Sequence, residues 1–224
     1  RLLRNSAGLP AGTIGEEYAP MSARPSLEEN LTQEARLFQE PGKGFFYSNP
    51  GFNLLELIVE DVTGQSFSAF MESEVLYPLG MHGASYQWRE EFRLQLPMGY
   101  EMDGTPVPAY VYPAAGSGGL FADVEDLANF VRAEMMPPYE LEQSVLSQDA
   151  IQQLHETQIE IPGLFGFVAD GYGYGHFTEE LPDGRQAVWH GGQGHGWMTH
   201  FHAVPEAGAG IVILTNSQRS WPFI

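Results

Sequence analysis

The clearest pattern of apolar and polar positions lies between residues 49 and 64. Asn49 is a residue type that caps helices, Pro50 suits a first helical turn, and Gly64 is a typical helix stop. The apolar residues between them recur at helical spacing. They predict a helix with one buried face, formed by Phe52, Leu55, Ile58, Val59 and Val62.

Four other segments carry weaker helical patterns. A short helix is expected over residues 26–38, inside the loop-rich stretch 10–45, and a second helix starts near Ser66. A third begins at Asp123, where acidic residues follow in the first turn and suit the helix dipole. The fourth starts near Ser147, and residues 81–118 indicate turns and short irregular strands.

Strand patterns dominate after residue 160. Three strands are expected, over residues 188–190, 197–204 and 211–216. Glycines at 191–196 link the first two strands, and residues 205–208 form the turn between the last two. Helices followed by antiparallel strands predict an α/β (α+β) fold, an antiparallel sheet flanked by helices. We expect one domain over 1–224, with a mostly helical and loop subdomain at 1–160 and the C-terminal sheet strands at 161–224.

Composition narrows the possible functions. The chain has 224 residues, no cysteine and a net charge of −19, which excludes disulfides and disfavours nucleic acid as a partner. No stretch reaches the roughly 20 apolar residues that a membrane span needs. The acidic surface is either that of an ordinary soluble protein or an adaptation to high salt. The compartment stays open, with a periplasmic or secreted location preferred over a cytoplasmic one.

Two short motifs carry candidate chemistry. Tyr47-Ser48-Asn49 stands directly before the strongest helix, where positive charge at the helix start could favour a phenolate at Tyr47, and Asn49 either caps the helix or binds a substrate carbonyl. His190-Gly191-Gly192-Gln193 ends a strand, and its glycines leave room for a substrate along the backbone. The N–H of Gln193 could then donate to an acyl oxygen as it gains charge. The alternatives are a simple helix cap and a glycine-rich hairpin.

Two further arrangements compete with these motifs. His190, His195, His200 and His202 could bind a metal, since alternate strand residues share one face, but no carboxylate accompanies them at ligand spacing. Ala115-Gly116-Ser117-Gly118-Gly119 resembles a loosened nucleophile elbow, with Asp123 or Asp170 and His190 as triad partners.

In combination the motifs resemble the serine β-lactamase and DD-peptidase-like superfamily, in its class C-related branch, which includes esterases and amidohydrolases. The matching stretches follow one another in the family's order: 2–10 (LLRNSAGLP), 47–55 (YSNPGFNLL), 78–81 (PLGM), 115–130, 172–175 (YGYG) and 190–216. In the first stretch Asn5 stands where the family usually has histidine. The resemblance implies a β-lactamase/transpeptidase-like fold, incomplete at both ends, and neither a metal nor an organic cofactor.

The resemblance also implies roles. Tyr47 would be the catalytic base, His190 would replace a motif lysine and support it, and the N–H of Gln193 would form half of an oxyanion hole. Asn49, Gly191 and Gly192 would bind the substrate. Histidine at position 190 is similar to the esterase and peptidase members rather than to true class C β-lactamases.

The family's Ser-x-x-Lys motif is absent from these residues: Lys43 is the one lysine, and Glu40 stands three positions before it. We expect the motif to precede Arg1, in a longer protein. The leading hypothesis is a serine hydrolase that acts through an acyl-enzyme on a small ester, amide or peptide, with its nucleophile outside this chain. A catalytically silent binding or scaffold protein and a metal-dependent hydrolase are the alternatives, and a complementing chain or a homo-oligomer is a possible partner.

Overall fold

The computed structural model describes residues 1–12, 15–135, 145–162 and 166–223. Helices and loops form its first part, together with a short hairpin of β1 (Gly99–Tyr100) and β2 (Pro106–Val107). The helical elements are α1 (Leu27–Glu34), α2 (Asn49–Thr63), α3 (Phe67–Met71), the π-helical turn η1 (Glu72–Leu76), α4 (Phe92–Gln95), α5 (Val124–Ala133) and α6 (Gln148–His155).

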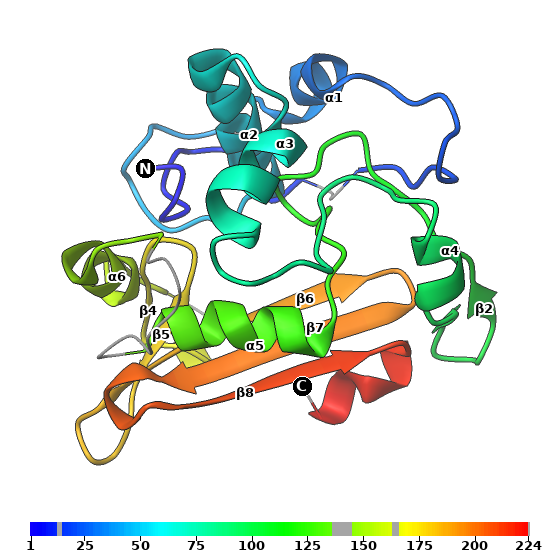
Figure 1. The fold of residues 1–224 in the computed structure, drawn as a ribbon. Helices are drawn as coiled ribbons and strands as arrows, with labels where there is room; N and C mark the ends of the chain where they lie inside the picture. The colour runs from blue at the N-terminus through cyan, green and yellow to red at the C-terminus, as the bar shows by residue number, and fades with distance from the viewer. Residues whose placement is uncertain (13–14, 136–144, 163–165, 224) are drawn as a thin grey trace.

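The second part is a six-stranded antiparallel sheet in which every strand pairs with the next one in sequence (Figure 1). Its strands are β3 (Ile159–Glu160), β4 (Gly171–Tyr172), β5 (Phe177–Glu180), β6 (Gln186–Gly194), β7 (Trp197–Val204) and β8 (Ala209–Thr215). The 3-10 turn η3 (Pro205–Ala207) joins the last two strands, and η4 (Gln218–Phe223) follows. The mixed α/β fold with an antiparallel sheet is confirmed, while the division at residue 160 stays a prediction.

Helix starts agree with the capping residues. The hydroxyls of Ser66 and Ser147 and the carboxylate of Asp123 each accept a backbone N–H in the first turn of the following helix. The helix expected over 26–38 is shorter, because α1 ends at Glu34 and the N–H of Phe38 donates to the carbonyl of Gly8 instead (3.1 Å).

The expected buried face of α2 is wrong. Ile58 and Val62 are 47% and 80% exposed. The inward face carries Asn53 and Glu56, whose side-chain oxygens accept hydrogen bonds from the backbone N–H groups of residues 115–117. A polar side chain can therefore replace apolar contact on a buried helix face when it satisfies backbone donors of a neighbouring loop.

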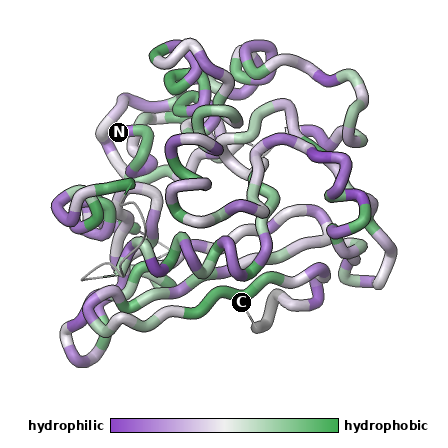
Figure 2. The backbone as a smooth tube through the Cα atoms, in the orientation of Figure 1, coloured by the Kyte–Doolittle hydropathy of each residue, from purple (hydrophilic) through white to green (hydrophobic). Residues whose placement is uncertain are grey.

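The expected strand at 188–190 is also too short. β6 continues through the glycines to Gly194, in register with β7 from Val188↔Ala203 to Gly194↔Trp197. The expected strand at 197–204 agrees with β7, and 211–216 overlaps β8, which is the continuous hydrophobic stretch next to the C-terminal turn in Figure 2.

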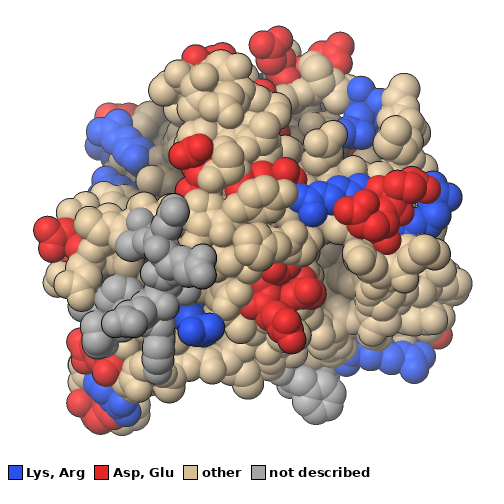
Figure 3. All heavy atoms as spheres, in the orientation of Figure 1, with Lys and Arg blue, Asp and Glu red and all other residues tan. Residues whose placement is uncertain are grey.

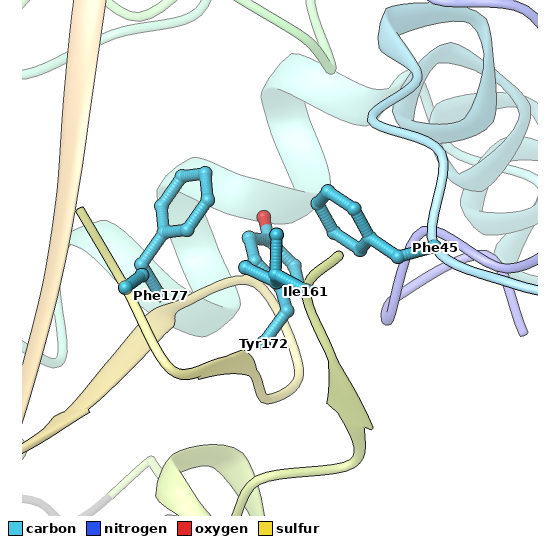
Figure 4. Close-up of a cluster of buried hydrophobic side chains, with 5 residues drawn as sticks. Phe45, Ile161, Tyr172 and Phe177 are labelled. Carbon is cyan, nitrogen blue, oxygen red and sulfur yellow. The ribbon is translucent and has the colours of Figure 1, made fainter. Parts of the chain in front are cut away.

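Two apolar clusters connect the helices with the sheet. Helix α5 lies against the sheet through Val131, which packs with Val188 and Ala203. The second cluster joins Phe45, before α2, to Ile161, Ala169, Tyr172 and Phe177 (Figure 4). Tyr47 packs against this second cluster, so the core directly supports a candidate site residue.

Charges lie mainly on the surface. Figure 3 shows acidic side chains in several separate groups over one face, with basic side chains beside some of them. Among the described residues, no helix is long and apolar enough to cross a membrane.

Candidate functional site

The segment that carries Tyr47 is fixed by Asn5. Asn5 is 2% exposed and adopts a left-handed backbone (φ 53°). Its side-chain oxygen accepts a hydrogen bond from the N–H of Ser48 (3.0 Å), and its backbone carbonyl accepts one from the N–H of Phe46 (2.7 Å). These two bonds hold the residues on either side of Tyr47 against the N-terminal loop.

Ser48, rather than Asn49, caps α2. The Ser48 hydroxyl accepts the N–H of Gly51 at 3.1 Å, and Asn49 is already the first helical residue. Its backbone N–H donates to the carbonyl of Ala11 (3.0 Å). The capping role expected of Asn49 is therefore wrong, and its half-buried carboxamide has no hydrogen-bond partner among the described residues.

Tyr47 and His190 lie side by side. Their ring centroids are 5.9 Å apart, and Tyr47 also stacks in parallel with Phe177, 6.4 Å between centroids. Phe177 lies 5.3 Å from His190, so one phenylalanine of β5 supports both rings. The structure thus brings together the two motifs that the sequence places 143 positions apart (190 − 47).

The start of α2 does not by itself favour a phenolate at Tyr47. Burial raises the pKa of the Tyr47 hydroxyl above its usual value. Tyr47 precedes the capping residue, so Ser48 rather than the phenol meets the N–H groups at the start of α2. A cation within about 4–6 Å is what would favour the charged form. Deprotonation of Tyr47 consequently requires a positive group that His190 does not supply.

His190 is held as a neutral ring. Its Nδ1 lies 2.8 Å from the carbonyl of Gly191, so Nδ1–H donates there and Nε2 remains the acceptor. Burial lowers the pKa of His190 to about 4, and the ring contacts with Tyr172 and Phe177 show the apolar surroundings that cause it. At neutral pH His190 can therefore accept a hydrogen bond but carries no charge.

The strand edge next to His190 is open. β5 pairs with β6 only from Gln186 to Trp189, whereas β7 pairs with β6 as far as Gly194. Residues 190–194 therefore have one side without a strand partner among the described residues. Such an edge presents backbone N–H and C=O groups that can pair with an extended ligand.

The two glycines of this edge differ in the space available for a side chain. Gly191, Gly192 and Gln193 are all exposed. A Cβ on Gly192 would lie 2.4 Å from Oγ1 of Thr199, which is too close, whereas a Cβ on Gly191 would meet its nearest atom at 3.6 Å. A side chain at 192 would therefore force Thr199 to move, whereas one at 191 would not.

The competing arrangements are not assembled. His195 binds the carboxylates of Glu17 (2.8 Å) and Glu101, and His200 and His202 share a face with ring centroids 6.0 Å apart. Within the described ranges, the three-residue group with metal-ligand geometry does not include any of the four predicted histidines.

The Ser117 alternative lacks its partners. The N–H of Ser117 donates to Asn53 on α2, Asp123 caps α5, and Asp170 accepts the N–H of Glu180. Both candidate aspartates therefore accept hydrogen bonds from nearby backbone N–H groups and do not form a triad with Ser117.

Sequence reasoning missed the aromatic walls of the site. Tyr172 is fully buried and Phe177 is 6% exposed, and both lie against His190. Their strands, β4 and β5, have only two and four residues, too short for an alternating pattern to be recognised.

Comparison with known proteins identifies the class. The sequence model of the Beta-lactamase family matches residues 1–223, and the chain therefore belongs to this family. The fold and the family place it in the serine β-lactamase and DD-peptidase-like superfamily.

Individual relatives support this assignment. Protein flp of Staphylococcus aureus is 26% identical over 223 residues, covering 96% of this chain and 42% of the relative. Penicillin-binding protein 4 of Amycolatopsis lactamdurans is 26% identical over 178 residues, covering 76% of this chain and 46% of the relative. The chain spans less than half the length of these two curated relatives.

Solved structures show the same fold. The octameric penicillin-binding protein homologue from Pyrococcus abyssi has a TM-score of 0.76 at 28% identity, covering 97% of this chain and 51% of that one. The D-amino acid amidase from Ochrobactrum anthropi SV3 has a TM-score of 0.70 at 22% identity, with 96% and 70% covered, and shows likeness of fold alone.

Proposed function

We propose that this chain forms the acyl-binding part of a serine hydrolase that cleaves a small ester, amide or peptide through an acyl-enzyme. The observation that carries the proposal is the contact between Tyr47 and His190 beside the open edge of β6. A general base and a row of free backbone donors are the two elements that acyl transfer needs next to a nucleophile.

The proposed reaction uses a serine outside these 224 residues. Its Oγ forms a bond to the acyl carbon while Tyr47, as phenolate, takes the hydroxyl proton. The bond from the acyl carbon to the leaving group then breaks, and Tyr47 gives the proton to that group. In the second half, water attacks the acyl carbon as Tyr47 takes a proton from it, and the bond to Oγ breaks as Tyr47 returns the proton to the serine. Burial raises the pKa of Tyr47, and a nearby cation such as a motif lysine would lower it again and hold Tyr47 deprotonated as the base.

The remaining residues position the substrate. The N–H of Gln193 donates to the oxyanion, a type of contact typically worth about 3–4 kcal/mol in the transition state. Asn49 binds the carbonyl side of the substrate through its carboxamide, and neutral His190 accepts a hydrogen bond from Tyr47 or from the substrate. Gly191 and Gly192 keep the strand edge open.

The test is covalent labelling of the protein expressed with its Ser-x-x-Lys segment. Incubation with a p-nitrophenyl ester or a penem should add the acyl mass to one serine, observed by mass spectrometry. Tyr47→Phe should slow labelling, while His202→Gln, on β7, serves as the matched control. An absence of both adduct and turnover would refute the enzyme proposal.

A catalytically silent binding protein is the second candidate, favoured by the open edge of β6, which could pair with an extended ligand without any reaction. Trp189 stacks on Phe177 (4.4 Å between centroids) and is a fluorescence reporter next to the open edge. Two results together would select this candidate. A D-amino acid amide would quench the tryptophan fluorescence saturably, and the chain expressed with a Ser-x-x-Lys segment would not hydrolyse the amide.

Assembly with another chain is compatible with either candidate. Ile211 on β8 is 55% exposed, and one solved relative is octameric. We propose a homo-oligomer or a complementing chain as the partner, which sedimentation analysis of the protein would detect.

A further inference from the structure

A second group of ionisable side chains lies buried behind the candidate site. Glu134 follows α5, His155 ends α6, and His176 stands between β4 and β5. Their exposed fractions are 5%, 4% and 5%. Carboxylates are almost never fully buried unless they are paired, so a buried carboxylate facing two imidazoles requires a specific reason.

The distances within this group suit a metal ion. Glu134 Oε1 lies 3.2 Å from His176 Nε2, and Glu134 Oε2 lies 3.6 Å from His155 Nε2. One ligand atom from each residue falls within 4.8 Å of the other two. Ligand atoms about 2.0–2.1 Å from a tetrahedral zinc are about 3.3 Å from each other, so a small contraction of the group would complete the coordination.

The ring of His176 is already oriented as a ligand. Its Nδ1 lies 3.2 Å from the carbonyl of Tyr174, and donation of Nδ1–H leaves Nε2 free toward Glu134. Phe130 lies parallel to the ring, 6.5 Å between centroids. A histidine that binds metal through one nitrogen commonly donates its other N–H to a backbone carbonyl in this way.

Three polar atoms of the group lack hydrogen bonds. Both ring nitrogens of His155 and Oε2 of Glu134 are buried and have no hydrogen-bond partner within the described ranges. Buried polar atoms without partners are uncommon and point to an ion or water that satisfies them. The rings of His155 and His176 are nearly perpendicular (83°), with centroids 5.5 Å apart, as two imidazoles around one ion can be.

We propose that Glu134, His155 and His176 bind one divalent transition-metal ion, of which zinc fits the donor set best. Two imidazoles and a carboxylate are a common zinc ligand set, whereas magnesium and calcium prefer oxygen ligands. His155 also lines a surface hollow of about 220 Å³ together with Gln152 and Glu156.

The ion would serve as a clamp rather than as the reaction centre. It would join the end of α5, the end of α6 and the start of β5, three elements far apart in sequence. His176 is followed directly by Phe177, which supports Tyr47 and His190. Metal binding would therefore fix the wall of the candidate site and would raise thermal stability.

The experiment measures metal binding without reference to hydrolysis, so that its failure and that of the proposed function are distinguishable. The chain is stripped with a chelator, titrated with Zn²⁺ or Co²⁺, and analysed for bound metal. We expect one ion per chain, a visible spectrum typical of tetrahedral Co²⁺, and a melting temperature that rises with Zn²⁺. His155→Gln and Glu134→Gln should each weaken binding by at least about 100-fold.

The matched control is the double variant His200→Gln/His202→Gln, which removes the other close pair of histidines and should bind Zn²⁺ with unchanged affinity. If a ligand variant does not fold, X-ray absorption spectroscopy of the zinc-loaded unmodified chain tests the proposal instead. It should show two imidazole ligands on the zinc. Binding below one ion per chain, unchanged affinity in His155→Gln, or a spectrum without imidazole would overturn the proposal in favour of a buried Glu134–His176 ion pair.

Discussion

Gly192→Ala tests whether the open strand edge depends on a missing side chain. The new Cβ would lie 2.4 Å from Oγ1 of Thr199, directly across the β6–β7 ladder. Thr199 is β-branched and stiff, so relief requires either a rotamer change or a local shift of the two strands. The adjacent position supplies a matched control, because the Cβ of Gly191→Ala would meet ordinary contact distances.

The magnitude follows from these distances. Overpacking of one methyl group costs about 1–3 kcal/mol in the free energy of unfolding, and a displaced rotamer costs about 0.5–1.5 kcal/mol. Replacement of a glycine by alanine in a strand interior raises the free energy of unfolding by about 0.5–1 kcal/mol, and this gain applies to both variants. We therefore expect Gly192→Ala to be about 1–3 kcal/mol less stable than Gly191→Ala.

Urea unfolding of five chains measures the clash directly: the unmodified chain, Gly191→Ala, and the three variants of the Gly192–Thr199 cycle. Thr199→Ala removes the colliding Oγ1, so the double variant Gly192→Ala/Thr199→Ala should recover the lost stability. The coupling energy of this cycle should be about 1–3 kcal/mol. Equal stability of Gly192→Ala and Gly191→Ala, or a coupling energy near zero, would refute the steric reasoning.

Two further predictions concern buried ionisable groups. Glu56→Ala should lower the free energy of unfolding by about 2–5 kcal/mol, because it removes the buried acceptor of two half-buried N–H donors, those of Ala115 and Gly116. Burial raises the pKa of Glu56 above 4.5 against these hydrogen bonds, so ionisation of Glu56 costs stability as the pH rises above that value. In urea unfolding, Glu56→Gln should therefore gain stability relative to the unmodified chain as the pH rises; a relative loss would contradict this sign. For His190, burial lowers the pKa to about 4 from the ordinary 6.5, so the unfolded chain takes up the proton first and stability falls as the pH drops from 6.5 towards 4. An NMR titration of the His190 imidazole should give a midpoint near pH 4. In His190→Gln, stability should fall less steeply as the pH drops from 6.5 towards 4. A midpoint near 6.5 would contradict a pKa lowered by burial.

Sequence patterns predicted the elements whose signals are local. Ser66, Asp123 and Ser147 each begin a helix, since a capping side chain acts within its own turn. The strand 197–204 was predicted correctly because local turn signals mark both of its ends, the glycines before it and the turn at 205–208 after it. Tyr47 and His190 were paired through the resemblance to a family, and the structure places their rings 5.9 Å apart.

Features that depend on distant contacts could not be predicted. The buried polar face of α2 exists because Glu56 meets backbone donors 59 and 60 positions away. The raised pKa of Tyr47 comes from burial, which no local pattern reports. Glu134, His155 and His176 follow no ligand-spacing motif, and only the packing of α5, α6 and the sheet brings them together.

The most direct test of the proposed function is the rate of acylation of the chain expressed together with the Ser-x-x-Lys segment that the proposal requires. Single-turnover labelling by a p-nitrophenyl ester, followed by mass spectrometry, isolates the step in which Tyr47 takes the serine proton. Loss of a general base should slow this step about 10²–10⁴-fold in Tyr47→Phe, while His202→Gln should react at the unmodified rate. Equal acylation rates in Tyr47→Phe and the unmodified protein would contradict the role given to the tyrosine beside His190.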